Sequence, residues 1–223
     1  MRLSYDLMRV QIEWDENNHA NEWVVESPML FRKIIGEMRV DTDKELRLKF
    51  FDKEKEMKLS SDVDVIFNPV KLDFNPRKVN VTLMKILVKA SISEDFYLST
   101  NKFKTKIIKY LSEVVDSEHF GFEIESDDFS IDQIAKAVNF HIVGDEDDFV
   151  ELITDYLEVM TELGGIKLFI FVGLRGYLED DELKRFVKNL KDRQIDILLF
   201  ENVDRGVVKE IPRVIIDRDL CEI

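Results

Sequence analysis

Apolar and polar residues alternate in several short runs of the first seventy residues, a pattern that predicts β-strands. The runs at 3–7 and 10–14 alternate, and Glu16-Asn-Asn-His19 supplies turn residues, so a β-hairpin is predicted here. A helix is predicted from Pro28, since apolar residues then recur every three or four positions as far as Met38. The predicted strands are residues 3–7, 10–14, 23–25, 46–51 and 63–67.

The pattern changes to helical spacing in the middle of the chain and returns to strands near the end. The predicted helices are residues 79–90, 102–115, 131–138, 149–163 and 179–192. The apolar runs Leu168–Val172 and Ile195–Glu201 flank the last helix and are typical of strands buried on both faces. This strand–helix–strand unit predicts a parallel sheet. The fold class is therefore α/β, with about ninety helical residues inserted into an α/β core.

Composition favours a folded cytoplasmic protein. The chain has 223 residues, of which 45% are hydrophobic, and the longest apolar run is far too short to cross a membrane. The N-terminal residues contain no apolar segment typical of export, and the single cysteine, Cys221, cannot form an internal disulfide. We therefore expect no membrane association.

Charge is distributed very unevenly along the chain. The total is −14, but residues 71–109 carry a net charge of +6 and residues 110–162 carry −15. Within the basic part, Lys102, Lys106 and Lys109 would share one face of a helix, with Phe103 and its apolar neighbours on another. Such a face can lie along the phosphates of nucleic acid. The alternative is that the basic and acidic segments are ordinary solvated faces that pair with each other.

An acidic cluster precedes the helix predicted at 131–138. It places five carboxylates within residues 123–132, and calcium is bound by several carboxylate and carbonyl oxygens. The spacing is not that of an EF-hand loop. The alternative is a helix N-terminus enriched in acids, with Ser130 or Asp128 as the cap.

The sequence gives little support to an enzyme. None of the eight glycines begins a phosphate-binding GxxxxGK[ST] motif, and the turn Gly173–Gly176 lacks the lysine of such a loop. Glu201 ends an apolar strand, where nucleotide hydrolases carry an acidic residue, but a cap or a salt bridge explains it equally well. The three histidines have no metal-binding spacing.

Three segments resemble the CRISPR-associated Csn-two family of type II-A spacer acquisition. They are LKFFD (Leu48–Asp52), KLFIFVGLRGYLEDDEL (Lys167–Leu183) and DILLFEN (Asp196–Asn202), and the similarity runs in order along nearly the whole chain. The resemblance implies a degenerate P-loop-NTPase-like head, formed by residues 1–72 and 149–223, and an inserted long α-helical leg, formed by residues 73–148.

The resemblance also implies a function. Members of the family form a homotetramer, a ring whose basic channel holds linear double-stranded DNA that enters from its ends without sequence preference. Calcium supports the ring, no enzymatic activity is known, and the expected partners are the CRISPR integrase complex and the effector nuclease.

Candidate site residues follow from the family pattern and from the charge distribution. The resemblance places calcium at Glu123, Glu125, Asp127, Asp128 and Gln133, where Gln133 stands at a position that is a carboxylate in some relatives. The DNA-binding candidates are Lys102, Lys104, Lys106 and Lys109, with Arg32, Lys33 and Lys49 added from the head. Two alternatives remain open at this point: a nucleotide-dependent enzyme with an unrecognised phosphate loop, and a pure protein–protein adaptor.

Overall fold

The structure is a computed structural model that describes residues 1–39, 47–117, 129–144 and 147–223. Its contacts divide the chain into two compact units. The α/β unit consists of Met1–Phe74 and Gly144–Ile223, and the helical unit consists of Asn75–Val143.

A five-stranded sheet forms the centre of the α/β unit, and all its neighbouring strands run parallel. This arrangement confirms the α/β fold with a parallel sheet that the sequence predicts. The strands in spatial order are β6 (Val63–Ile66), β7 (Leu168–Val172), β8 (Asp196–Glu201), β3 (Ala20–Val25) and β9 (Arg213–Ile216).

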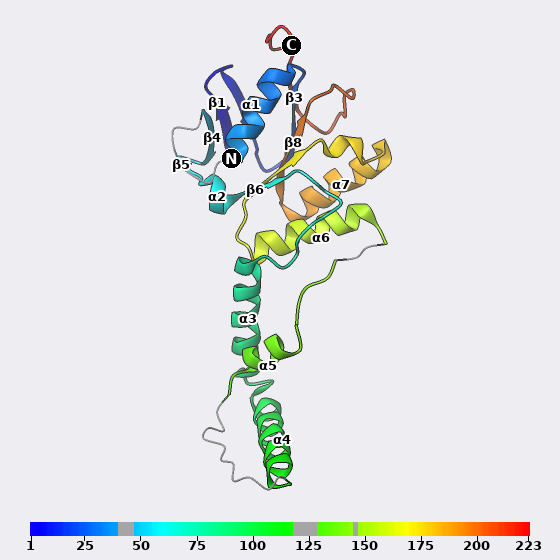
Figure 1. The fold of residues 1–223 in the computed structure, drawn as a ribbon. Helices are drawn as coiled ribbons and strands as arrows, with labels where there is room; N and C mark the ends of the chain where they lie inside the picture. Colours follow the sequence, from blue (N-terminus) through cyan, green and yellow to red (C-terminus); the bar gives the residue numbers. More distant parts are fainter. Residues whose placement is uncertain (40–46, 118–128, 145–146) are drawn as a thin grey trace. The chain divides into compact units, whose positions relative to one another are not determined.

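Both faces of this sheet are covered, which explains why β7, one of its inner strands, is apolar at every position. Leu168 and Ile170 of β7 point into the core beneath α1 (Pro28–Met38), whereas Phe169 and Phe171 point to the opposite side. There Phe171 contacts Phe186 edge to face, with ring centroids 6.1 Å apart. The helices α6 (Phe149–Glu162) and α7 (Asp180–Arg193) cover that second face (Figure 1).

A second, antiparallel sheet packs on the same core as α1. Its strands in spatial order are β2 (Val10–Glu13), β1 (Arg2–Tyr5), β4 (Leu48–Asp52) and β5 (Lys55–Glu56). Leu3 lies opposite Ile12, so β1 and β2 form a hairpin, but its turn is at residues 6–9 and not at Glu16–His19. Trp14 fixes this sheet to the parallel one, because its indole Nε1 donates a 2.9 Å hydrogen bond to the carbonyl oxygen of Ile197. The short helix α2 (Leu59–Asp62) leads into β6.

The helix α1 begins where the sequence predicts. Pro28 occupies the first turn, where a missing N–H costs no hydrogen bond, and Leu30, Ile34 and Met38 form the buried stripe. Phe31 of the same helix stacks on Phe200 of β8, with ring centroids 4.7 Å apart. Burial of each such side chain contributes about 1.5–3 kcal/mol relative to exposure.

The helical unit has a much smaller core. It contains α3 (Arg77–Ser91), α4 (Tyr97–Asp116) and α5 (Ile131–Ala137), and no residue of α4 is buried. Asn75 holds the segment after α5 in place: its side chain donates to the carbonyl of Ile142 at 2.7 Å and accepts the N–H of Ile142 at 2.8 Å. Among the helices that the structure describes, none has the length and apolar character needed to cross a bilayer.

A partly buried hydrogen bond links α6 to β6, an edge strand of the parallel sheet. The hydroxyl of Tyr156 donates to Oδ2 of Asp64 at 2.7 Å, and the Tyr156 ring contacts Phe74 edge to face. Burial raises the pKa of the Asp64 carboxyl, and the hydrogen bond from Tyr156 partly opposes that rise. Burial also raises the pKa of the Tyr156 hydroxyl, so it remains a donor at neutral pH.

We predict that Tyr156→Phe lowers the free energy of unfolding by about 1–3 kcal/mol near neutral pH, because the buried Asp64 carboxylate loses its donor. A raised carboxyl pKa stabilises the fold at low pH, and that contribution disappears as the pH rises through the folded-state value. Loss of the hydroxyl raises this pKa further. The deficit in urea unfolding should therefore be larger near pH 7 than near pH 4. Tyr177→Phe, at an exposed tyrosine, is the control.

Candidate nucleic-acid interface and the edge of the parallel sheet

The predicted lysine face lies on α4. Lys102, Lys106 and Lys109 follow one another at helical spacing on one side of the helix, and all three are exposed. Lys109 Nζ lies 3.7 Å from a carboxylate oxygen of Glu113, but a pair this exposed is worth little. In the part of the chain that the structure describes, Lys102 and Lys106 form no ion pair. Their charges are available to an anionic ligand.

Lys104 does not belong to this row. It lies two positions from Lys102, on the other side of α4, and its ammonium sits 5.6 Å from the ring centroid of Phe129. That side also carries the apolar face of α4. Its exposed members, each with at least 44% of its surface accessible, are Tyr97, Phe103, Tyr110, Leu111 and Val114.

The other basic candidates belong to the α/β unit. Arg32 and Lys33 are exposed on α1, and the Arg32 guanidinium donates a 3.2 Å hydrogen bond to the carbonyl of Pro28. Lys49 is half-buried on β4, opposite Ser4. Among the seven basic candidates, Lys102, Lys106 and Lys109 thus form the row that a helix can present to phosphates.

The candidate calcium ligands fall mostly outside the described residues: Glu123, Glu125, Asp127 and Asp128 lie in the range 118–128. Gln133 is described and forms a capping box at the start of α5, where its Oε1 accepts the N–H of Ser130 at 3.1 Å. A calcium ion would have to be coordinated by this same Oε1 of Gln133. Within the described ranges, no group of three histidine, cysteine or acidic side chains could hold a metal.

Buried charges meet at the carboxyl edge of the parallel sheet. The turn η1 (Leu174–Gly176) lies at this edge, separated from the end of β7 by one residue. Arg175 in this turn donates from Nη1 to Oε1 of Glu22 at 2.8 Å, and both side chains are at most 4% exposed. The backbone N–H of Arg175 donates to Oε1 of Glu201 at 3.0 Å. One arginine therefore organises two buried acidic residues.

The loop after β8 closes over the same residues. The Arg175 guanidinium also donates to the carbonyl oxygens of Gly206 at 2.9 Å and Arg205 at 3.3 Å. Arg213 lies beside Glu22 on the neighbouring strand β9, with Nε 3.7 Å from a Glu22 oxygen, and pairs with Asp204. Parallel α/β proteins commonly bind phosphate at this edge. Here, however, the guanidinium of Arg175 is already hydrogen-bonded to the Glu22 carboxylate and to backbone carbonyls of the chain itself.

Glu201 is the residue at this edge whose acidity changes most. Burial, and to a smaller extent the charge of Glu22, raises the pKa of Glu201 to about 7, although the Arg175 N–H opposes the rise. The sequence singles out Glu201 but gives no indication that Glu22, Arg175 and Arg213 would join it. The sequence signal that could have suggested a partner is Glu22 itself, a glutamate inside the largely apolar strand β3. A carboxylate buried in such a strand requires a cation beside it.

The fold is that of a mixed α/β protein with a fully covered parallel sheet, and comparisons with known proteins agree with it. A family model described as CRISPR-associated protein (Cas_Csn2) matches residues 39–220. The crystal structure of Stu0660 of Streptococcus thermophilus is similar with a TM-score of 0.58 and 12% identity, covering 97% of this chain and 74% of that chain. At this identity the likeness concerns the fold alone. A comparison with curated protein sequences finds no match.

The chain therefore belongs to the CRISPR-associated Cas_Csn2 family, as the resemblance of its three segments indicates. Membership gives the protein a CRISPR-associated role.

We predict that Glu201→Gln changes how stability depends on pH. Because the folded-state pKa of Glu201 is raised from 4.5 to about 7, the wild-type protein gains stability as the pH falls from about 7 to 4.5. Glutamine cannot ionise but can still accept the Arg175 N–H. The variant should therefore be more stable than the wild type near pH 8, by up to about 3 kcal/mol, with a difference that vanishes near pH 4.5.

The measurement is urea unfolding of both proteins across this pH range. Glu162→Gln, at an exposed carboxylate on α6, is the matched control and should leave the profile unchanged. Parallel profiles for Glu201→Gln and wild type would mean that Glu201 is ionised in the folded protein throughout the range.

Proposed function

We propose that this protein is a non-catalytic, sequence-independent double-stranded DNA-binding protein that assists CRISPR spacer acquisition in a type II-A system. The observation that carries the proposal is the exposed row of Lys102, Lys106 and Lys109 on α4 of a Cas_Csn2 family member. A row of lysines contacts phosphates without reading bases, so binding would not depend on sequence. The partners are the CRISPR integrase complex and the effector nuclease.

The proposal includes assembly into a homotetrameric ring. Its support is the apolar face of α4, on which Phe103, Tyr110 and Val114 are exposed although the helix is amphipathic. Exposed apolar faces of this kind usually mark an interaction surface. A second copy covering that face would leave the lysine row on the other side of the helix open to DNA. Symmetry would then repeat the row around one axis.

The proposal also assigns a head and a leg. The head, residues 1–72 and 149–223, would be a P-loop-like fold that has lost its phosphate loop, and the leg, residues 73–148, would be the helical insertion. Support comes from the division of contacts at Phe74 and Gly144 and from the ion pair of Arg175 with Glu22 at the sheet edge. The Arg175 guanidinium at this edge is paired with Glu22 and is not free to hold a phosphate. This favours a head that has lost its phosphate loop over a nucleotide-dependent enzyme.

Calcium is the proposed cofactor, bound by Glu123, Glu125, Asp127 and Asp128 with Gln133. Carboxylate oxygens suit calcium, and five acidic residues within ten positions are otherwise mutually repulsive. The capping box requires the Gln133 oxygen to exchange the Ser130 N–H for the ion. Gln133 would thus be the weakest of the five ligands.

We predict that replacing Lys102, Lys106 and Lys109 together with glutamate abolishes binding of blunt-ended duplex DNA. Wild-type affinity should fall steeply with salt, with a slope near −0.9 in log K against log salt for each phosphate contacted. Gel shift or fluorescence anisotropy at several salt concentrations measures both effects. The control replaces Lys184, Lys188 and Lys191 of α7, which gives the same change in net charge on another helix.

Undiminished affinity in the α4 variant would contradict the proposed interface. If the wild-type protein binds no duplex even at low salt, the adaptor alternative replaces the DNA-binding function. A salt-independent affinity would exclude phosphate contacts as its main source.

We predict that removing calcium loosens the assembly or lowers its melting temperature, because the acidic residues near 123–128 would then repel one another. Native mass spectrometry and thermal unfolding, each with calcium and with a chelator, measure this. Asp127→Asn with Asp128→Asn should reproduce the effect of the chelator. If neither assembly nor melting responds, the acidic cluster only caps α5.

A further inference from the structure

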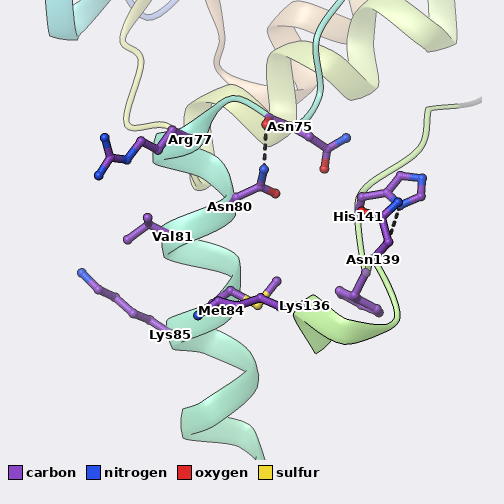
Figure 2. Close-up of a pocket in the computed structure, with 10 residues that line it drawn as sticks. Asn75, Arg77, Asn80, Val81, Met84, Lys85, Lys136, Asn139 and His141 are labelled. Carbon is purple, nitrogen blue, oxygen red and sulfur yellow. Dashed lines mark hydrogen bonds between the residues drawn. The ribbon is translucent and has the colours of Figure 1, made fainter. Parts of the chain in front are cut away.

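A pocket of about 820 Å³ lies within the helical unit, and the proposed DNA contacts do not use it. Its walls are α3, the end of α5 and the segment 139–141 (Figure 2). In Figure 2, Asn80 and Met84 of α3 face this segment, while Arg77 and Lys85 extend from another side of the same helix. The volume falls within the range of about 300–1,000 Å³ that is usual for small-molecule sites.

The walls of the pocket are held by hydrogen bonds. The paired bonds between Asn75 and Ile142 fix the segment after α5, and the Asn80 amide donates to the carbonyl of Asn75 at 2.7 Å. His141 Nδ1 lies 2.6 Å from the carbonyl oxygen of Asn139 and therefore carries the hydrogen of that bond. The shape of the pocket is thus largely formed before any ligand binds.

The lining is basic although the whole chain is acidic. Arg77, Lys85 and Lys136 contribute three cations, and none of the described residues that line the pocket is acidic. Lys136 pairs with Asp132 at 2.7 Å. Within the described residues, Arg77 and Lys85 have no ion-pair partner. An anionic group of a ligand would find its counter-charge on these two side chains.

The remaining lining combines apolar surface with amides. Phe140, on the segment 139–141, is 48% exposed, so a planar ring could stack on it without displacing protein atoms. Val81, which is 47% exposed, lies on the side of α3 that carries Arg77 and Lys85 (Figure 2). The side chains of Asn80 and Asn139 offer donors and acceptors in the same pocket. Simple phosphate would leave the apolar part uncovered, and a fatty acid would leave the amides unpaired. A ligand with an anionic group, a planar ring and a polar ring edge would match the cations, the apolar surface and the amides of the pocket.

We infer that this pocket binds a nucleoside phosphate, with Arg77 and Lys85 at the phosphate and Phe140 and the asparagine amides at the base. The ligand could be a free nucleotide or the unpaired terminal nucleotide of a DNA strand. Both sources present the same chemistry to the pocket. The site is separate in residues from the α4 lysine row, so the inference does not depend on the proposed DNA-binding face.

The test is calorimetric titration of the full-length protein with 2′-deoxyadenosine 5′-monophosphate at physiological salt. We expect saturable binding at one site per chain, and at least about tenfold weaker binding of both deoxyadenosine and inorganic phosphate. Arg77→Glu and Phe140→Ala should each weaken nucleotide binding about tenfold. Lys89→Glu, one turn beyond Lys85 on α3 and outside the pocket, should change it less than twofold.

Competition distinguishes the two sources. Displacement of the nucleotide by a duplex with a single-stranded overhang, but not by a blunt duplex, would identify a strand end as the ligand; no displacement by either would identify the free nucleotide. The variant lacking Lys102, Lys106 and Lys109 should retain nucleotide binding, which separates this site from the DNA interface. Absent saturation, equal binding of phosphate alone, or unchanged affinity in Arg77→Glu would overturn the inference.

Discussion

Both faces of the parallel sheet are covered, so any charged side chain on a central strand must find its partner inside the protein. Glu22 is such a side chain: it lies on β3, is 1% exposed and points away from the α1 core. An isolated buried carboxylate would cost several kcal/mol, so the fold supplies Arg175 from the turn after β7 and Arg213 from β9. These two arginines therefore tie the turn after β7 and the strand β9 to Glu22.

The same requirement bears on function. Arg175 lies in the turn after β7, at the edge where a parallel α/β fold commonly holds a phosphate, but its hydrogen bonds go to Glu22 and to the carbonyls of Arg205 and Gly206. A ligand phosphate would have to compete with a buried carboxylate for this group, and removing Arg175 would leave Glu22 with only Arg213, whose Nε lies 3.7 Å away. Anion binding is therefore more favourable at exposed lysines, where nothing has to be displaced, and Lys102 and Lys106 meet that condition.

How far the sequence predicts this structure depends on the range of the interactions. The alternation of β1 and β2, the helix after Pro28 and the unit formed by β7, α7 and β8 are local patterns, and the structure has all of them close to the expected residues. The pair of Arg175 with Glu22 joins residues 153 positions apart, and no local pattern specifies it. Lys104 shows a different limit: its spacing in the lysine run is clear, but the contact with Phe129 comes from a separate segment. Gln133, expected as a ligand, accepts the N–H of Ser130, the N-cap residue of its own helix.

The helix α4 has twenty residues, yet none is buried, and its apolar face is left with Phe103, Tyr110 and Val114 exposed. Helices in proteins gain most of their stability from packing an apolar face, and α4 leaves much of its apolar face exposed. The lysine row adds repulsion between like charges at Lys102 and Lys106, one turn apart. Both costs decrease if a second copy covers the apolar face and phosphates neutralise the lysines. The features that make α4 unfavourable in the single chain are thus the ones that an assembled, DNA-bound state would relieve.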